Sequence, residues 1–361
     1  SYTRPSNDKR RGMRNSQIIK WGQSNKGYRG VSNKTMYSMS EWIILQEEID
    51  QLYKMARHYE KNSVEEVLQD CTVLCCTHST AGSELLEGID FNIAAVDEGS
   101  QATEPAALIS MVKAEKWILS GDHKQLPPTV LSNEAKNLSY SLFERLIDIC
   151  PEFSSLLSVQ YRMNATLMKF SNERFYDNQL VAHDSVENSD LAEIVDPKRL
   201  RFSEIIYQIC DPAFPLTFVD VAFSEEKKFA GETSWHNQTE AEITSQLSEA
   251  LIMAGLSQQQ IGIISPYSSQ RRLIRELLND TFPEIEVKTV DGFQGREKEL
   301  MIISFVRSNS REEIGFLQDE RRLNVAITRA KKKAILIGSA ETLRSSPAFA
   351  QLIRSSHSIK V

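Results

Sequence analysis

The pattern of apolar and polar positions divides the chain into an irregular start, one long helix and a series of short alternating elements. Residues 1–40 are rich in Ser, Asn, Gly, Lys and Arg and follow neither a helical nor a strand period, which predicts loop or disorder. Residues 41–69 carry apolar side chains three and four positions apart, which predicts a helix. These side chains are Trp42, Leu45, Ile49, Leu52, Met55 and Tyr59.

From Cys71 onward, short apolar runs alternate with helical periods, which is the rhythm of a parallel α/β sheet. The first series predicts strands at 71–77, 91–97 and 116–120 and helices at 104–114 and 139–149. The second series predicts strands at 156–160, 216–221, 260–265, 285–290, 299–306 and 333–338. Its helices are predicted at 164–176, 236–254, 268–280 and 319–330, with loops and short helices over 182–212.

Pro151 ends a helical period just before the second series begins, so we place a domain boundary near it. The sequence therefore predicts two α/β lobes, residues 71–153 and 154–361. Residues 1–70 are expected to be a separate segment, a basic loop followed by a helix, left from an insertion.

Composition places the chain among globular proteins, since 41% of its 361 residues are hydrophobic and 25% are charged. It contains no run of about 18 apolar residues and no apolar segment near Ser1. We therefore expect no membrane span and a location in the nucleus or cytoplasm. Five cysteines without a CxxC pair argue against a disulfide framework or a structural zinc site. Cys75 and Cys76 lie in an apolar run and are expected inside a strand core.

The net charge of −7 argues against a general binder of polyanions, because such affinity comes from Lys and Arg. The distribution of charge changes this picture. Residues 1–40 hold nine Lys and Arg but a single acidic residue, Asp8, so this segment is basic while the remainder is acidic. The run Lys9-Arg10-Arg11 is also a candidate nuclear-import signal.

Two carboxylates, Asp97 and Glu98, follow the predicted buried strand 91–97. Ligands of open α/β sheets bind at the carboxyl ends of strands, so the pair fits a magnesium carboxylate beside a water-activating base. A solvated or helix-capping Asp-Glu pair gives the same pattern, so the pair alone does not distinguish a catalytic role from a structural one. The stretch 121–129, GDHKQLPPT, adds a polar loop stiffened by two prolines. Its Gln125 has an amide that can donate to a γ-phosphate oxygen and accept from water.

Three arginine-bearing elements follow in the second lobe. They are QYRM at 160–163, GFQGRE in a glycine-rich turn at 292–297, and RRLNVAITRAK on a predicted helix at 321–331. On that helix Arg322 and Arg329 share a face while Leu323 and Ile327 anchor another. A guanidinium that reaches phosphate across a cleft stabilises transition-state charge, although an isolated arginine on a helix usually belongs to a solvated face.

Taken together, six segments in this order resemble superfamily 1 helicases of the 5′-to-3′ branch. The segments are DEGSQATEP, GDHKQLPPT, QYRMN, SPYSSQ, VDGFQGREKE and RRLNVAITRAKK. Their amino-acid sequences are most similar to those of the immunoglobulin mu-binding and polymerase-alpha-associated helicases and of the nonsense-mediated-decay helicases. The resemblance covers about residues 71–345. It implies two RecA-like lobes of the P-loop NTPase class, with parallel sheets and a first lobe that is incomplete at its N-terminus.

The same resemblance implies an ATP-dependent helicase or translocase that hydrolyses ATP between its lobes. ATP and Mg²⁺ would be its cofactors, single-stranded DNA or RNA its partner, and the motor would work as a monomer. Carried over residue by residue, it makes Asp97 the magnesium carboxylate, Glu98 the base and Gln125 the γ-phosphate sensor. It makes Arg162 and Arg329 the γ-phosphate arginines.

Further positions match by resemblance. Tyr161 corresponds to the tyrosine that packs on adenine, Glu297 to the carboxylate that meets the ribose, and Gly295 belongs to the same nucleotide-binding turn. Four positions match strand-contacting residues of the family, through the backbone or by stacking. They are Thr77, Pro266, Tyr267 and Thr289.

One feature of the family has no counterpart, because no GxxxxGK[ST] phosphate loop occurs in the 361 residues. Without its amides and lysine, ATP lacks its main phosphate contacts. We therefore expect the chain to be the carboxyl-terminal portion of a motor and inactive alone. The alternative is a non-catalytic nucleic-acid-binding adaptor derived from a helicase. An adaptor has no physical need to keep Glu98, Gln125, Arg162, Glu297 and Arg329 together, which favours the motor.

Overall fold

The chain was analysed as a computed structural model, which describes residues 12–27, 30–200, 203–221, 224–278 and 281–361. It divides into two compact units, Ser1–Thr77 and His78–Val361. Within the described ranges, no helix is both long enough and apolar enough to cross a membrane. The run Lys9-Arg10-Arg11 lies outside the described residues.

The first unit consists of a short helix, α2 (Asn15–Gln23), packed on the start of a long one, α3 (Asn33–Asp70). The Ser32 hydroxyl caps α3 by accepting a hydrogen bond from the Thr35 amide at 3.3 Å. The prediction of loop over residues 1–40 is therefore wrong for the described part, although the helix predicted at 41–69 is confirmed. The irregular composition hides a small core because its apolar residues are far apart in the sequence. They are Met13, Ile18, Met36, Met39 and Ile43.

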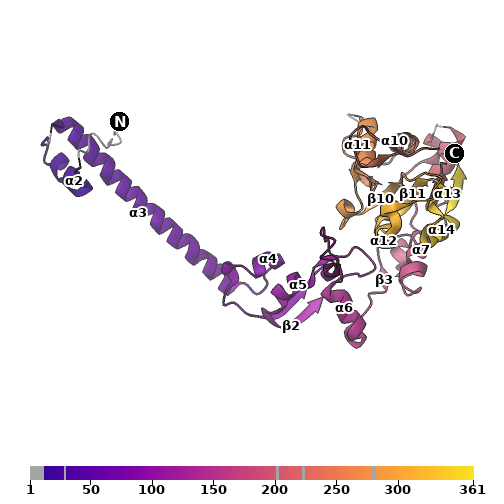
Figure 1. Cartoon of the computed structure of the whole chain (residues 1–361), viewed down its shortest axis with the longest axis horizontal. Coiled ribbons are helices and arrows are strands. Elements are labelled where there is room, and N and C mark those ends of the chain that lie inside the picture. The colour runs from indigo at the N-terminus through magenta and orange to yellow at the C-terminus, as the bar shows by residue number, and fades with distance from the viewer. Residues whose placement is uncertain (1–11, 28–29, 201–202, 222–223, 279–280) are drawn as a thin grey trace. The chain divides into compact units, whose positions relative to one another are not determined.

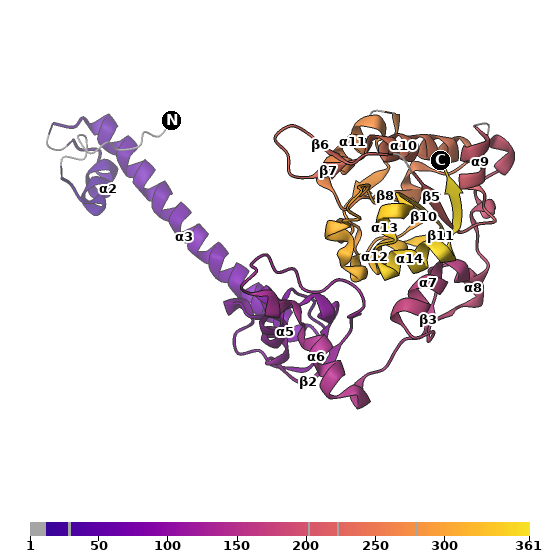
Figure 2. The same ribbon diagram turned by 45° about the vertical axis from the view of Figure 1, so that its right-hand side comes forward.

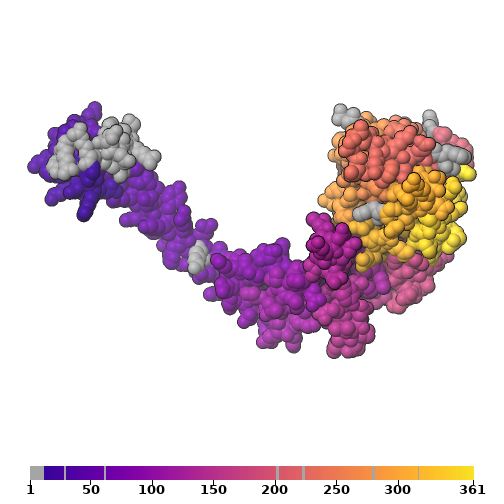
Figure 3. Space-filling model, viewed as in Figure 1, coloured from indigo at the N-terminus to yellow at the C-terminus, as the bar shows by residue number. Residues whose placement is uncertain are grey.

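Along α3, residues 51–60 are all exposed, and in Figure 3 this stretch has no other part of the first unit against it. The segment 71–77 that follows is not a strand, so that prediction is wrong. Among the described residues no strand pairs with it, and Val73 is 78% exposed. The expectation of buried thiols at Cys75 and Cys76 fails for the same reason, because both are exposed.

The second unit opens with α4 (His78–Ala81) and two parallel strands, β1 (Phe91–Val96) and β2 (Ala114–Leu119), joined through α5 (Glu104–Met111). Helix α6 (Leu142–Ile149) packs against α5. The sequence predicted a buried strand at 91–97, yet Ile93 is 56% exposed and Ile118 is 61% exposed. The strand itself is confirmed, but its burial is not, because no other described strand joins β1 and β2.

A six-stranded, all-parallel sheet forms the centre of the second lobe, in the order β12-β5-β11-β10-β8-β9. Its inner strands are continuous apolar runs, as expected for a sheet covered on both faces. The strands are β5 (Leu216–Asp220), β8 (Ile261–Ile264), β9 (Glu286–Lys288), β10 (Lys298–Ser304), β11 (Ala330–Gly338) and β12 (His357–Lys360).

Helices cover both faces of this sheet, as Figures 1 and 2 show. One face packs on α7 (Ala165–Phe175), α12 (Glu320–Ile327), α13 (Ala340–Leu343) and α14 (Pro347–Ser355). The other packs on α9 (Glu204–Cys210), α10 (Gln238–Met253) and α11 (Ser268–Leu278). Alternate residues of one strand point to opposite faces, so Leu336 lies in the first core and Ile335 in the second.

The predicted strands and helices of this lobe are confirmed in type, and the predicted α/β class with a parallel sheet is confirmed. The predicted boundary near residue 153 stays a prediction. Short elements complete the lobe. The strand predicted at 156–160 is reduced to β3 (Val159–Gln160), which pairs with β4 (Val181–Ala182), and α8 (Asp184–Glu187) lies where short helices were predicted. The hairpin of β6 (Lys227–Lys228) and β7 (Trp235–His236) was not predicted.

Candidate nucleotide site

The carboxyl end of β1 presents two exposed carboxylates. Glu98 adopts the left-handed conformation with φ 51°, and the Asp97 side chain accepts its amide hydrogen at 3.0 Å. The Gln101 amide donates to the Glu98 carboxylate. The turn is fixed to the next strand because the Gly99 amide donates to the Ser120 carbonyl at 2.7 Å. Both carboxylates are thus held at the sheet edge and open to solvent.

These carboxylates suit a hard cation with oxygen ligands. Within the described ranges no group of three or more His, Cys, Asp or Glu side chains is arranged to hold a metal. A magnesium ion at Asp97 would therefore take most of its ligands from water and phosphate oxygens, which is how Mg²⁺ is usually held beside nucleotides.

The loop after β2 lies next to this turn. A side chain at Gly121 would place its Cβ 2.8 Å from the Ser100 amide nitrogen, so the close approach requires glycine. The Asp122 carboxylate organises the loop by accepting from the Lys124 amide at 2.9 Å and from the Gln125 side chain at 2.7 Å. Gln125 is therefore held in one orientation and is not a free loop side chain.

On the second lobe, Arg162 and Glu297 form an ion pair 2.5 Å apart. Arg162 also donates to the Thr328 carbonyl at 3.2 Å, and Lys331 lies 3.0 Å from the other Glu297 oxygen. Partial burial acts to raise the pKa of Glu297, but Lys331 and Arg162 outweigh it, so the pKa lies below its usual value. Glu297 stays ionised and holds the arginine in place.

Arg329 connects the loop that carries Gln125 to the second lobe. Its side chain is buried and donates to the Val325 backbone carbonyl at 3.1 Å and to the side-chain amide oxygen of Gln125, also at 3.1 Å. Burial and the nearby Arg162 charge lower its pKa to about 10, while the Glu98 charge acts in the opposite direction. The guanidinium remains a cation at neutral pH. The side chains of Gln125 and Arg329 thus meet directly.

The position of Arg329 corrects the prediction of a helix over 319–330. Helix α12 ends at Ile327 with Thr328 as its C-cap, and the chain enters β11 at Ala330. Arg329 therefore lies in the turn between helix and strand. Its side chain is held there by the bonds to Val325 and Gln125.

Sequence reasoning missed two residues that tie the loop to the second lobe. The Tyr176 hydroxyl donates to Asp122 at 2.6 Å, and the Asn324 side chain donates to both the Tyr176 oxygen and the Lys124 carbonyl at 3.0 Å. Burial, with the Asp122 charge, raises the pKa of Tyr176, so the hydroxyl keeps its proton. Nothing in the local pattern marks Tyr176, which ends an ordinary amphipathic helix.

Replacing Tyr176 with phenylalanine should loosen this loop. We expect amide hydrogen exchange at Lys124 and Gln125 to speed up about 10-fold, equivalent to about 1.4 kcal/mol, since a hydrogen bond to a charged group is lost. Hydrogen exchange followed by mass spectrometry measures this. Tyr140→Phe is the control, because Tyr140 also donates to an aspartate, Asp148, within the first lobe. Equal acceleration in both variants would contradict the bridging role of Tyr176.

Two predicted nucleotide-binding positions lie open on the second lobe. The Tyr161 ring is 65% exposed and lies 4.5 Å, between ring centres, from His183. Gly295 adopts φ 69°, a conformation that favours glycine, and nothing lies within 4 Å of the position a Cβ would take. Both are available to a ligand.

The four predicted strand contacts are not brought together with these residues. Thr77 belongs to the first unit, whereas Pro266, Tyr267 and Thr289 follow β8 and β9. Tyr267 is 9% exposed, and the Thr289 hydroxyl accepts the Gly292 amide at 3.0 Å. Their contact with a nucleic-acid strand stays a prediction.

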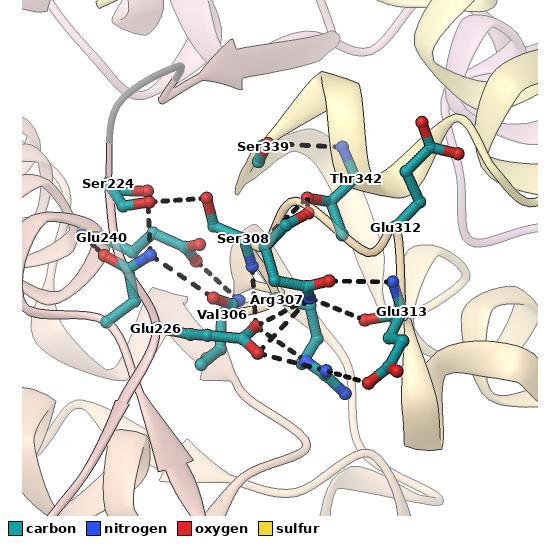
Figure 4. Close-up of polar contacts among 12 residues, drawn as sticks. Ser224, Glu226, Glu240, Val306, Arg307, Ser308, Glu312, Glu313, Ser339 and Thr342 are labelled. Atoms are coloured by element: carbon teal, nitrogen blue, oxygen red, sulfur yellow. Dashed lines mark hydrogen bonds and ion pairs between the residues drawn. The ribbon is translucent and has the colours of Figure 1, made fainter.

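A buried polar network lies beside the ends of β5 and β10 (Figure 4). Arg307 forms an ion pair with Glu226 at 2.8 Å and stands 3.9 Å from Glu313. The Glu240 carboxylate accepts from Ser304 at 2.7 Å and from the Val306 amide at 2.9 Å. Val306 has φ 73°, which is strained for a β-branched residue. The network thus holds the backbone after β10 in an unusual conformation.

Burial raises the pKa of Glu240 to about 8, from an ordinary value of 4.5, so folding favours its protonated form. Between these values the unfolded chain releases the proton and the folded chain keeps it, and this group therefore lowers stability as pH rises. Glu240→Gln should gain stability relative to the parent as pH increases from 5 to 8. Urea unfolding at several pH values measures this, and Glu242→Gln, exposed on the same helix, should show no such trend.

Comparison with known proteins agrees with this geometry. Residues 138–341 match a family model described as an AAA domain, and residues 3–133 match a second model with the same description. The chain belongs to the superfamily 1 helicases, a class with RecA-like α/β folds, which confirms the resemblance of its six segments.

Three relatives illustrate the match. An uncharacterized ATP-dependent helicase of Methanocaldococcus jannaschii is 42% identical over 99% of this chain and 52% of its own length. The DNA-binding protein SMUBP-2 of Mesocricetus auratus is 36% identical over 87% of this chain and 32% of its own. The DNA polymerase alpha-associated DNA helicase A of Schizosaccharomyces pombe is 36% identical over 82% of this chain and 44% of its own length. The chain spans about half the length of the first and less of the others.

Proposed function

We propose that this chain carries the catalytic carboxylates and the arginines of an ATP-driven motor that moves 5′-to-3′ along single-stranded DNA or RNA. The observation that carries the proposal is the 3.1 Å hydrogen bond between Gln125 and Arg329, which come from loops 204 residues apart. A sensor amide and an arginine that meet at a pair of strand-end carboxylates suit phosphoryl transfer. Family membership and the matched relatives support the same reading.

In this proposal each side chain has one task. Asp97 would hold a magnesium ion, which would supply positive charge to the phosphates of the nucleotide. Glu98 accepts a proton from the attacking water, and Gln125 positions that water against the γ-phosphate. Arg162 and Arg329 stabilise the charge that develops on the γ-phosphate oxygens.

Binding of the nucleoside falls to the second lobe. Tyr161 offers an exposed ring for the adenine, while Glu297 and the open turn at Gly295 meet the ribose. Glu297 also keeps Arg162 at the phosphate through their ion pair. The motor is proposed to act as a monomer, with Pro266, Tyr267, Thr289 and Thr77 on the strand.

The 361 residues should hydrolyse ATP poorly by themselves, because they include no GxxxxGK[ST] loop to hold the phosphates. A longer form of the protein that carries such a loop should show strand-stimulated turnover. Glu98→Gln in that form should lower kcat by about 10³-fold, since it removes the base. Phosphate release assays on the two lengths and the variant measure this.

Robust strand-stimulated turnover by the 361 residues would contradict this prediction. A complete lack of turnover at every length would favour the alternative, a non-catalytic adaptor that binds nucleic acid. Glu104→Gln is the matched control, because Glu104 pairs with Arg145 in the first lobe at 2.6 Å and has no role at the phosphates. Its turnover should stay within about threefold of the parent.

A further inference from the structure

The N-terminal part of the first unit is a small folded module, here called the head. It is formed by α2 and the first turns of α3 (residues 12–43, apart from 28–29). Its core side chains are at most 7% exposed. A Cβ at Gly22 would lie 2.3 Å from the Ser40 hydroxyl oxygen, so the two helices touch closely there. Figures 1 and 2 show α2 lying against the start of α3. The described part of the basic segment, residues 12–27 and 30–40, therefore folds into a defined surface.

Up to residue 40 this surface carries positive charge alone, and Glu41 is the one acidic residue within the head. Between residues 12 and 40 the sequence has five Lys and Arg and no Asp or Glu. The four cations that the structure describes, Arg14, Lys20, Lys26 and Lys34, are all exposed. None of them forms an ion pair with another described residue. In the second lobe, by contrast, Arg174 is paired with Glu320.

The lack of ion pairs at these four cations has an energetic consequence. An arginine that is already paired must give up its carboxylate before it can bind a phosphate, whereas the head cations have no such cost. The rest of the chain is acidic, since 48 of the 49 acidic residues lie after residue 40, and it repels polyanions. The distribution of charge thus makes the head a place in the described chain where a polyanion is attracted.

The surroundings of the cations favour nucleic acid over an acidic protein. Asn15, Ser16 and Gln17 are exposed and can donate to phosphate and sugar oxygens. Among the described residues of the head, Tyr37 is the one large hydrophobic side chain that is exposed, at 50%. A single ring suits base stacking, whereas a stable protein interface needs a larger apolar centre.

We propose that the head is a phosphate-backbone binding site for nucleic acid that works without ATP and separately from the nucleotide site. Its affinity is electrostatic and follows the counterions released by Arg14, Lys20, Lys26 and Lys34. Four phosphate contacts on a single strand correspond to a slope of about −3 in a plot of log affinity against log salt. Between 50 and 200 mM salt this slope weakens binding about 60-fold.

The test uses the 361-residue chain with fluorescently labelled oligo-dT and oligo-U, without ATP or magnesium, so the outcome does not depend on hydrolysis. Anisotropy titrations at several salt concentrations give the affinity and the slope. Replacing Arg14, Lys20, Lys26 and Lys34 together with alanine should weaken binding at least 10-fold and reduce the slope by about 3. The matched control replaces four exposed cations of the second unit, Lys136, Lys198, Arg344 and Lys360, and should leave both unchanged.

Folding of the head is checked separately. A variant in which the three lysines become arginine keeps the charge and should bind within threefold of the parent, with unchanged helicity by circular dichroism. Unchanged binding by the alanine variant, or an equal loss in the control, would overturn the proposal. Displacement of the oligonucleotide by polyglutamate as readily as by unlabelled oligonucleotide would also overturn it, in favour of an acidic protein partner.

Discussion

Replacing Arg329 with alanine should lower kcat for ATP hydrolysis about 10³-fold in a form of the protein that carries a phosphate loop, with a smaller effect on KM. The guanidinium contacts Gln125 directly. In the proposed site its loss would remove transition-state charge stabilisation and would also free the Gln125 side chain. Arg329→Lys should recover little, because Arg329 bonds the Val325 carbonyl through Nε and Gln125 through Nη2, and the single nitrogen of an ammonium does not reproduce this fork. Single-turnover hydrolysis measures the chemical step.

The matched control is Arg321→Ala on α12, a partly exposed arginine that lies 3.6 Å from Asp319. Its turnover should remain within about twofold of the parent. Equal kcat in the Arg329→Ala variant and the parent would remove Arg329 from the reaction and would leave the contact with Gln125 a structural one.

Replacing Arg307 with alanine should cost about 3–5 kcal/mol in the free energy of unfolding. The Arg307 and Glu226 side chains are 6% and 8% exposed, so the variant leaves a buried carboxylate without its cation (Figure 4). The Ser308 amide and the Asn309 side chain still donate to Glu226, but neutral donors do not replace a charge. Urea unfolding followed by tryptophan fluorescence and circular dichroism measures the change.

Arg174→Ala provides the comparison, because the Arg174–Glu320 pair is about one-third exposed on both sides. Loss of this exposed pair should lower the free energy of unfolding by no more than about 1 kcal/mol. The double variant Glu226→Gln with Arg307→Met should recover part of the stability, since no unpaired charge remains. Similar costs for Arg307→Ala and Arg174→Ala would contradict the importance of burial.

The second lobe was predictable because its strands are continuous apolar runs separated by regular helical periods. Leu336 and Ile335 belong to opposite faces of one strand, and such a strand can be stable only between two layers of helices. The same reasoning failed at 71–77, where the apolar run is present but no described strand pairs with it. Composition alone cannot supply the partner that a strand requires.

The head was missed for the opposite reason. Its core joins Met13 and Ile18 to residues some 20 positions later, and no local period reveals such a contact. At the nucleotide site, the motifs identified Gln125 and Arg329, but their direct contact depends on how two loops meet in space. Tyr176 and Asn324 could not be predicted, because their importance comes from the partners that tertiary structure gives them.

The most direct test of the central claim is strand unwinding by the longer form and its Glu98→Gln variant, with duplexes that carry either a 5′ or a 3′ single-stranded tail. We predict ATP-dependent unwinding of the 5′-tailed duplex by the parent, and loss of unwinding with retained strand binding in the variant. Unwinding that persists in Glu98→Gln, or strand binding without any ATP-dependent unwinding by the parent, would contradict the claim that these residues form the ATP site of a motor.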